Sequence, residues 1–535
     1  MKRKKFIQLC LSGSAFVGLS TLLYSCADFV RTQLKLRRAG VGADIGHLVR
    51  TPLNGQEKIS QTFETDVLII GGGISGLTAG YFLQKQSKLD YKILELDKTI
   101  GGNSQSGENS FSKFPYGAHY LPIPNSDDHE LIQFLVEKKI INSIDEDGLP
   151  FFNEDDLCHD PHERILQNNY WNEGLMPVKN LTPKDKNELD KFLSFAEILK
   201  NVKGPNDKYV FQIPIHEGDL NDDWRKLDEI SFKQYLIQQG YSSDYLFWYL
   251  NYSCRDDFGQ GIEHISAFAG LHYFAARRGK GANCKSNEVL TWAEGNGKLV
   301  SLLAETQGNQ IHTNQIVRSI SVHENGVEIV VQHTSTKEFY LYNAKKIIMA
   351  IPFHVRQKLL PLQLKSIQAP SHQPWLVSTI LLSHFDDKHG FPICWDNVFK
   401  EGKSLGFINN RNQYLGTNTE IKNCFTLYMP LDDDLPSQTR KNYYTKSDEE
   451  LKQTILNEWK KYYPNIEDSI LELDFMLWGH GMVSPGIHYL CHPERNELRK
   501  PIDNKVYFAH TDYSGISIFE EAFWQGKTAV NELLK

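Results

Sequence analysis

The chain has 535 residues, a length that supports two or more domains and a large hydrophobic core. Hydrophobic residues make up 40% of it and charged residues 23%, which is typical of a globular protein. The formal net charge is −8 at pH 7, so no excess of basic side chains indicates binding of nucleic acid.

The first residues have the features of an export signal. The four residues Lys2–Lys5 are all basic, and Phe6–Ser25 is an uncharged, moderately apolar stretch. Leu23–Cys26 resembles a bacterial lipobox, in which Cys26 would be lipidated, and Arg3–Ile7 resembles a degenerate twin-arginine signal. The alternative is an uncleaved anchor, because about 20 apolar residues can span a bilayer. Both interpretations predict an exported protein held at a membrane, as a periplasm-facing bacterial lipoprotein or through an N-terminal anchor.

A glycine-rich turn between a strand and a helix is the strongest pattern in the chain. Val67–Ile70 predicts a buried strand, and Leu77–Gln86 predicts the helix that follows it. Between them lies G-x-G-x-x-G, the dinucleotide-binding fingerprint, which lets the backbone approach a pyrophosphate at the helix N-terminus. The residues expected to hold the cofactor at this turn are Gly71, Gly72, Gly73, Ile74, Ser75 and Gly76.

The next strand, predicted over Tyr91–Leu96, carries the acid that a dinucleotide site requires. Glu95 follows the glycine turn at close to the spacing of about 20 residues expected of a carboxylate that binds a ribose 2′-hydroxyl. An acid at this position favours FAD or NAD over a 2′-phosphorylated cofactor. A surface carboxylate at a strand end is the alternative.

A second glycine pair distinguishes this chain from a plain NAD domain. Gly101-Gly102 comes shortly after the second strand, and Phe114–Asn125 forms a loop further on. With the glycine turn, these segments resemble the superfamily of flavin-containing amine oxidases, phytoene desaturases and protoporphyrinogen oxidases. The resemblance implies a tightly held FAD, with the glycine pair at its phosphates and the loop beside its flavin ring. The residues that it assigns to the cofactor are Gly101, Gly102, Asn103, Ser104, Gly117, Ala118 and His119, although Asn103 stands where most amine oxidases have arginine.

Three later segments resemble the parts of the same superfamily that return to FAD. Val317 corresponds to the residue whose backbone pairs with adenine, and Ala350 corresponds to a strand end near the cofactor. Asp512 corresponds to the acid that binds the ribityl chain, ahead of a terminal helix that points at the pyrophosphate. His510 and Glu521 depart from the pattern, since glycine is usual at both positions. A plain NAD(P) enzyme, the remaining alternative for the nucleotide site, would not need this last module.

The resemblance and the order of predicted elements define an α/β fold. A Rossmann-like FAD-binding domain is interleaved with a substrate domain that consists of a mixed sheet and a helical cap. Residues 1–26 are the signal or anchor, and 27–60 are a polar tether. The FAD-binding domain takes 61–125, 281–355 and 481–535, the helical cap takes 126–280, and the second part of the substrate domain takes 356–480.

Three residues are candidates for catalysis. His119 lies in the loop beside the flavin ring, and His480 is expected at a strand end facing the ring, where a histidine can act as acid or base. Arg255 adjoins Asp256 and Asp257 in the cap and could bind an anionic substrate or transfer protons. The alternatives are a hydrogen-bonded structural histidine at His480 and an ion-paired structural turn at Arg255.

Two further observations limit the chemistry. The strand after the Ala-Ile-Pro segment carries Ser378 and Thr379 but no lysine, whereas many amine oxidases have a lysine there near flavin N5. This difference argues against amine oxidation specifically. Cys158, His159 and His162 could ligate a metal, but no second ligand cluster lies nearby in the sequence, so we expect a polar loop and no metal.

The predicted function is FAD-dependent oxidation, as an oxidase, dehydrogenase or desaturase, by hydride transfer from a substrate C–H bond to flavin N5. The substrate would be a small, partly apolar molecule, and electrons would pass to oxygen or to a carrier in the membrane. One alternative is an FAD-dependent isomerase or mutase without net redox, for which the missing lysine is no obstacle. Another is a non-catalytic FAD- or nucleotide-binding protein that kept the fold.

Overall fold

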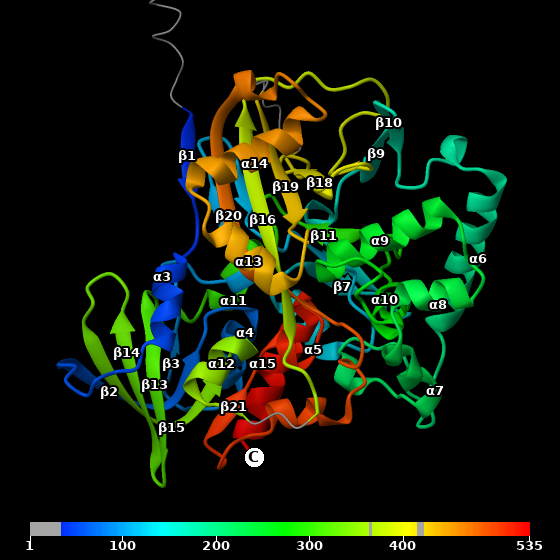
Figure 1. The fold of residues 1–535 in the computed structure, drawn as a ribbon. Coiled ribbons are helices and arrows are strands. Elements are labelled where there is room, and N and C mark those ends of the chain that lie inside the picture. Colours follow the sequence, from blue (N-terminus) through cyan, green and yellow to red (C-terminus); the bar gives the residue numbers. More distant parts are fainter. Residues whose placement is uncertain (1–33, 363–365, 415–421) are drawn as a thin grey trace, which may run out of the picture.

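The computed structural model describes residues 34–362, 366–414 and 422–535. The predicted export signal, including Cys26, therefore lies outside the described residues. Two large sheets organise the described chain, one above the other in Figure 1, and helices pack against both. The predicted α/β class, with a Rossmann-like part, a mixed sheet and a helical cap, is confirmed.

The lower sheet carries the glycine turn. Its strands lie in the order β12 (Ile311–His312), β3 (Tyr91–Leu94), β2 (Ile59–Ile70), β15 (Phe339–Met349), β14 (Gly326–His333) and β13 (Gln315–His323), and β21 (Val506–Phe508) pairs with β15. β2 is parallel to both of its neighbours. The helices beside it are α4 (Ile74–Gln86), α11 (Gly297–Ala304) and α15 (Phe519–Leu533). The run Val67–Ile70 is buried throughout, as expected for a parallel strand covered on both faces.

The upper sheet has eight strands. They lie in the order β1 (Lys35–Arg38), β20 (Ile470–Ser484), β16 (Ser371–Leu382), β19 (Asn423–Pro430), β18 (Gly406–Asn409), β17 (Asp396–Phe399), β9 (Glu163–Gln167) and β10 (Tyr170–Glu173). β16 pairs antiparallel with both β19 and β20. Two helices, α13 (Pro436–Tyr444) and α14 (Asp448–Lys460), follow β19. Trp459 of α14 is fully buried against Phe407 and Phe425, so this helix closes the core of the sheet.

A group of helices lies to the right of the sheets in Figure 1. It contains α6 (Pro183–Leu199), α7 (Asp222–Arg225), α8 (Phe232–Gln238), α9 (Asp244–Phe258) and α10 (Ala267–Ala275), while α5 (His129–Glu137) lies nearer α15. Gly270 lets α10 approach α8, because a Cβ there would lie 2.2 Å from the Phe232 ring. The region predicted as a helical cap is not purely helical, since β9 and β10 leave it to join the upper sheet. Leu166 of β9 and Trp171 of β10 are buried because these short strands join the upper sheet, whose other core residues come from segments far away in the sequence.

Several short strands form small ribbons beside the two sheets. They are β4 (Ser106–Glu108), β5 (Lys113–Pro115), β6 (Tyr120–Pro122), β7 (Ile141–Ile144), β8 (Pro150–Phe152) and β11 (Val289–Thr291). The pairing of β6 with β11 matters for the site, because it fixes the loop that contains His119. Thr291 of β11 donates its hydroxyl proton to the carbonyl oxygen of His119 at 2.8 Å.

The described part of the predicted tether belongs to the folded body. β1 pairs in parallel with β20, and two short helices, α3 (Ala43–Gly46) and η1 (His47–Arg50), follow it. The folded region therefore begins before Gln61. Its polar composition concealed this, because several of its contacts are ion pairs with residues that lie far away in the sequence. Within the residues that the structure describes, no helix has the length and apolar character needed to cross a bilayer.

Candidate active site

The glycine turn is held by close backbone contacts. Gly71 has φ +108°, and a Cβ there would lie 2.3 Å from the carbonyl oxygen of Ala350. A Cβ on Gly76 would lie 1.9 Å from the carbonyl oxygen of Gly71, so neither position accepts a side chain without movement. Gly73 is different, because the nearest atom to a Cβ there, the Cα of Gly102, would be 3.8 Å away. No side chain caps α4, which leaves its first N–H groups available to an anion.

Glu95 lies beside this turn at the end of β3. Its carboxylate accepts hydrogen bonds from the backbone N–H groups of Gly72 and Asp97, each at 2.8 Å. Burial raises the pKa of Glu95 to about 7 in spite of these hydrogen bonds. The two backbone donors orient the carboxylate where the ribose hydroxyls of a dinucleotide would lie.

An extended cavity of about 570 Å³ connects these features, and we call it the cofactor channel. The predicted cofactor residues that line it are Gly71, Gly73, Ile74, Ser75, Glu95, Gly101, Gly102, Asn103, Ser104, Ala118, Val317, Ala350 and Asp512. Gly72 and Gly76 support the wall from behind, whereas Gly117 and His119 line a second cavity. The uncapped helix, the space at Gly73 and the length of the channel fit an extended dinucleotide of the size of FAD.

A cluster of imidazoles around Asp512 forms one wall of the channel. Asp512, on η10 (Thr511–Tyr513), accepts hydrogen bonds from His372 Nε2 at 2.8 Å and from the backbone N–H of Phe353 at 2.7 Å. His510 Nδ1 lies 3.1 Å from the same carboxylate. Burial by itself would raise the pKa of Asp512, but the charges and hydrogen bonds of the two histidines hold it well below its usual range. These partners direct the carboxylate toward protein groups beside the channel rather than toward the solvent.

His480 belongs to this wall and not to a strand end as expected. It lies within β20, and its ring stacks on that of His354 with the ring centroids 3.7 Å apart. Burial lowers the pKa of His480 far below its usual value, and the neighbouring His354 adds to the effect. The ring is therefore neutral at physiological pH, and it lines the cofactor channel rather than the second cavity.

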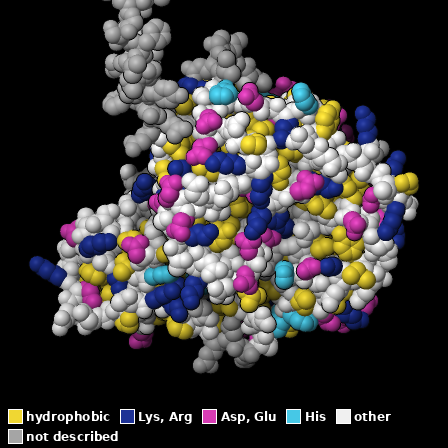
Figure 2. All heavy atoms as spheres, turned by 45° about the horizontal axis from the view of Figure 1, so that its top comes forward, with side chains coloured by type: hydrophobic (Ala, Val, Ile, Leu, Met, Phe, Trp, Pro, Cys, Tyr) yellow, Lys and Arg dark blue, Asp and Glu magenta, His cyan; other side chains and the backbone are white. Residues whose placement is uncertain are grey.

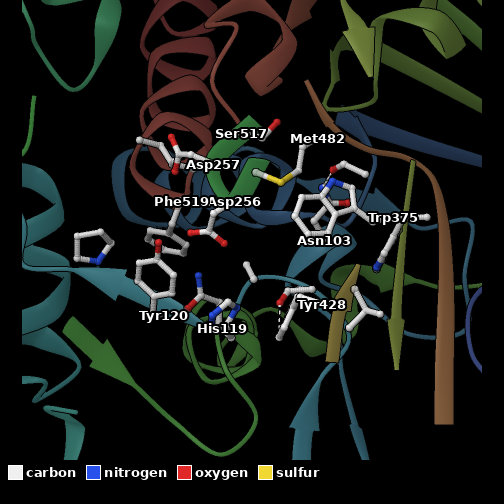
Figure 3. Close-up of a pocket in the computed structure, with 18 of the residues that line it drawn as sticks. Asn103, His119, Tyr120, Asp256, Asp257, Trp375, Tyr428, Met482, Ser517 and Phe519 are labelled. Carbon is white, nitrogen blue, oxygen red and sulfur yellow. Dashed lines mark hydrogen bonds between the residues drawn. The ribbon is translucent and has the colours of Figure 1, made fainter. Parts of the chain in front are cut away.

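The second cavity, which we call the inner pocket, has a volume of about 130 Å³ and adjoins the channel (Figure 3). Residues that line both cavities are Asn103, Ala118, Asn296, Trp478, Gly481, Ser517, Ile518 and Phe519. Its remaining walls include the aromatic rings of Tyr120, Trp375 and Tyr428. A ligand in the inner pocket would therefore lie against the end of whatever occupies the channel.

Three carboxylates and one guanidinium give the inner pocket its charge. Asp256, Asp257 and Glu520 line it together with Arg277, which lies 3.4 Å from Asp257. Burial and the adjacent Asp257 together raise the pKa of Asp256 to about 7, although Arg277 acts to lower it. The Oε2 atom of Glu520 has no hydrogen-bond partner although the side chain is only 5% exposed. An unpaired buried acceptor of this kind favours a ligand that donates hydrogen bonds.

His119 lies in the inner pocket, and Arg255 does not. The His119 ring packs 4.4 Å from that of Tyr428, and burial lowers its pKa to about 4. Arg255 donates to both carboxylate oxygens of Asp432, at 2.6 and 3.1 Å, and to the carbonyl oxygen of Lys403. The ion-paired alternative describes Arg255 better than a catalytic role does, although α9 carries it directly before two pocket carboxylates.

Sequence reasoning missed most of the inner pocket. Several of its lining residues belong to no local motif, so the sequence carried no signal that would have identified them. They are Arg277, Glu520, Tyr428 and the tryptophans. The side chains that β16 contributes are Trp375 and Val377 rather than Ser378 or Thr379, and no lysine is among the described residues that line the pocket. In the part of the chain that the structure describes, no group of three histidines, cysteines or carboxylates is arranged to hold a metal.

The fold and the channel are those of a dinucleotide-binding enzyme, with a second cavity beside the channel. Residues 74–534 match the model of the flavin containing amine oxidoreductases, and the chain belongs to this family. FAD is therefore its cofactor, and the prediction of an FAD-dependent oxidoreductase is confirmed. No curated protein sequence matches the chain.

Solved structures of similar fold have low sequence identity to the chain. Putrescine oxidase bound to putrescine has 17% identity and a TM-score of 0.62, with 88% of this chain and 99% of that chain covered. Cyclohexylamine oxidase from Brevibacterium oxydans IH-35A has 16% identity and a TM-score of 0.60, with 88% and 98% covered. The CLA-producing fatty acid isomerase from P. acnes has 15% identity and a TM-score of 0.58, with 87% and 98% covered. At these identities the likeness describes the fold and leaves the substrate open.

Proposed function

We propose that the enzyme oxidises a small amine that binds as a cation, at a carbon next to its nitrogen, and passes the electrons to oxygen or to a carrier in the membrane. The observation that carries this proposal is the inner pocket, which three carboxylates and one arginine line together with aromatic rings. Figure 3 labels two of these carboxylates, Asp256 and Asp257. The pocket opens onto the channel where the flavin ring would lie.

The charges of the inner pocket favour a cationic ligand. Asp256, Asp257 and Glu520 exceed the single charge of Arg277, so with all groups ionised the local charge is negative. Buried carboxylates are costly unless they are paired, and an ammonium group would supply the missing partner. The faces of Trp375 and Tyr428 can also attract a cation. An alkyl chain attached to the ammonium would pack against the same rings.

The chain's own residues would position and deprotonate the amine. FAD in the channel supplies the hydride acceptor. Asp256, with its pKa near 7, is suited to accept a proton from the substrate ammonium and so to free the nitrogen lone pair. His119 is neutral at this pH and can accept a hydrogen bond from the same nitrogen. The aromatic rings exclude water from the reacting carbon.

An isomerase acting on an anionic chain remains the second candidate because of the fold it shares with the fatty acid isomerase. A carboxylate substrate would meet three carboxylates and one arginine in the inner pocket, which is electrostatically unfavourable. No lysine is among the described residues that line the pocket, which argues against the arrangement of many amine oxidases, in which a lysine lies near flavin N5. We give the three carboxylates more weight than the missing lysine, because they determine whether the pocket favours a cationic or an anionic substrate.

The test is anaerobic mixing of the holoenzyme with monoamines, diamines and unsaturated fatty acids while the flavin absorbance is followed. Loss of the oxidised flavin bands with an amine supports the proposal. Product from a fatty acid without lasting loss of these bands would contradict it in favour of isomerisation. Readmitting oxygen, or adding a quinone, then identifies the electron acceptor from the rate of reoxidation.

The N-terminal sequence supports a second proposal, that the protein is exported and held at a membrane. The basic start, the apolar stretch and Cys26 are its only support. Fractionation of cells that express the full chain or the Cys26→Ala variant tests it. Membrane association that is lost in the variant supports a lipoprotein, association that is kept supports an anchor, and a soluble full chain contradicts both.

A further inference from the structure

The N-terminal segment forms part of the cofactor channel. We define residues 39–51, between β1 and the loop that leads to β2, as the strap. Strap residues that line the channel are Gly40, Val41, Gly42, Ala43, Gly46, His47, Val49 and Arg50. In Figure 1 this blue segment descends from β1, beside β20, to α3, in front of the lower sheet. The strap thus spans both sheets across the cavity that they enclose.

One end of the strap is anchored by a partly buried ion pair. Arg37 of β1 donates from Nε and a terminal nitrogen to the Asp474 carboxylate at 2.5 and 2.7 Å, and it lies 3.0 Å from Glu472. Asp474 is only 1% exposed, so its carboxylate depends on Arg37 as a counter-ion. Arg38, the next residue, pairs with Asp448 at the surface. β1 also pairs with β20 through its backbone, and of its two arginines Arg37 is the one that pairs with a buried carboxylate of that strand.

The other end of the strap is anchored at the lower sheet. Arg318 of β13 donates to the carbonyl oxygen of Thr51 at 3.0 Å, and Val49 packs against the large apolar core. At the near end Gly40, with φ +81°, brings the backbone so close to β20 that a Cβ would lie 2.5 Å from Met476 Sδ. Both ends are therefore fixed, while the channel runs beneath the middle.

The strap is the weakest wall of the channel. None of its residues is fully buried, and it is made of two helices of one turn each. Most of the other lining residues lie on or directly beside strands and helices of the two cores, such as β2, α4 and β20, and such elements open only at a high cost in free energy. A wall that is held by a few polar contacts opens at much lower cost. The strap would therefore offer a bound dinucleotide the least costly way out of the channel.

We infer that the strap retains FAD, and that Arg37 acts as a positioning residue that keeps it closed over the cofactor. The inference rests on the assignment of FAD and is independent of the substrate proposed above. It predicts that loosening the strap accelerates release of FAD without a comparable loss of stability in the protein freed of FAD.

The test compares the Arg37→Ala and Arg38→Ala variants of the full chain, purified with FAD. Each holoprotein is diluted to nanomolar concentration, and the rise of free flavin fluorescence gives the release rate. We expect Arg37→Ala to release FAD about tenfold faster than the natural protein and Arg38→Ala to stay within about twofold, because only Arg37 supports the closed strap. Arg37→Lys should recover part of the difference. Equal rates in the two alanine variants would overturn the inference.

A second measurement covers the case in which Arg37→Ala does not fold. A protease site inserted at Gly55, where a side chain would meet nothing within 4 Å, allows the loop behind the strap to be cut in the folded holoprotein. We expect cutting to accelerate FAD release relative to the same protein uncut. Unchanged release after complete cutting, or a lower unfolding temperature with unchanged release, would show that the strap does not retain the cofactor.

Discussion

The carboxylate of Asp512 and Nε2 of His372 lie 2.8 Å apart, both almost fully buried, on the wall of the cofactor channel. They come from η10 and β16, so this contact joins the last part of the lower layer to the centre of the upper sheet. The N–H of Phe353 donates to the same carboxylate. Asp512 is thus the point where three segments that surround the cofactor are tied together.

Replacing Asp512 by asparagine should destabilise the protein. Hydrogen bonds to a charged acceptor contribute about 1.5–3 kcal/mol, so we expect a loss of that order at pH 7 in the free energy of unfolding. The folded-state pKa of Asp512 lies well below the unfolded value of about 3.9, so this contribution is present above pH 4 and is lost as the pH falls through the folded pKa. The difference in the free energy of unfolding between the natural protein and the variant should therefore become smaller below pH 4.

Urea unfolding of both proteins between pH 3 and 7, with FAD removed, checks this expectation. Glu146→Gln is the control, since Glu146 is an exposed carboxylate. A gap that stays constant with pH would show that Asp512 stabilises the fold without its charge.

Substrate affinity should depend on the ionisation of Asp256. Its pKa is raised to about 7, so the carboxylate forms as the pH rises through that value and then attracts a cationic substrate. The KM for an amine should fall between pH 6 and 8, and Asp256→Asn should abolish this dependence and weaken binding by about 10- to 100-fold at pH 8. Steady-state kinetics over this range measure both effects. A variant that keeps the pH dependence would assign it to another group.

Of the two arginines near the inner pocket, we expect only Arg277 to affect substrate binding. Arg255 pairs with Asp432 at the surface, and such pairs contribute about 0.2–1 kcal/mol, so Arg255→Ala should leave KM unchanged and stability nearly so. Arg277→Ala removes the one arginine or lysine among the described residues that line the pocket, and it leaves Asp257 without its ion-pair partner. We expect the KM for amines to change in this variant alone. Kinetics and thermal unfolding of the pair distinguish a binding residue from a structural one.

Gly76→Ala should disrupt the glycine turn. The added Cβ would lie 1.9 Å from the Gly71 carbonyl oxygen, which forces the helix away from the strand and costs about 1–3 kcal/mol or more. We expect a less stable protein that purifies with little FAD. Gly308→Ala is the matched control, because a Cβ there meets nothing within 4 Å. Flavin content per protein after purification gives the answer, and equal content in the two variants would contradict the role of Gly76.

The nucleotide half of the site could be predicted from the sequence because it depends on short segments. The glycine turn and Glu95 follow from spacing within one strand, turn and helix, and the glycine pair was assigned through the family resemblance; the sheet brings all three into one channel. Asp512 and Val317 could be placed only through the family resemblance. Tightly packed backbone allows few residue types, so this region keeps a pattern that can be recognised.

The substrate half was decided by the tertiary structure. The inner pocket combines Tyr120, Asp256, Arg277, Trp375 and Glu520, which no spacing relates. Asp256 and Asp257 line the pocket whereas the adjacent Arg255 pairs with Asp432 at the surface, because successive residues of a helix point in different directions around its axis. The strap could not be predicted from the sequence for the same reason. β1, which leads into it, forms by pairing with the edge of β20 and by the ion pair of Arg37 with Asp474. Short local segments therefore indicated a dinucleotide, and the family resemblance identified it as FAD, whereas long-range packing determined what lies next to it, because only packing brings distant charges and rings together.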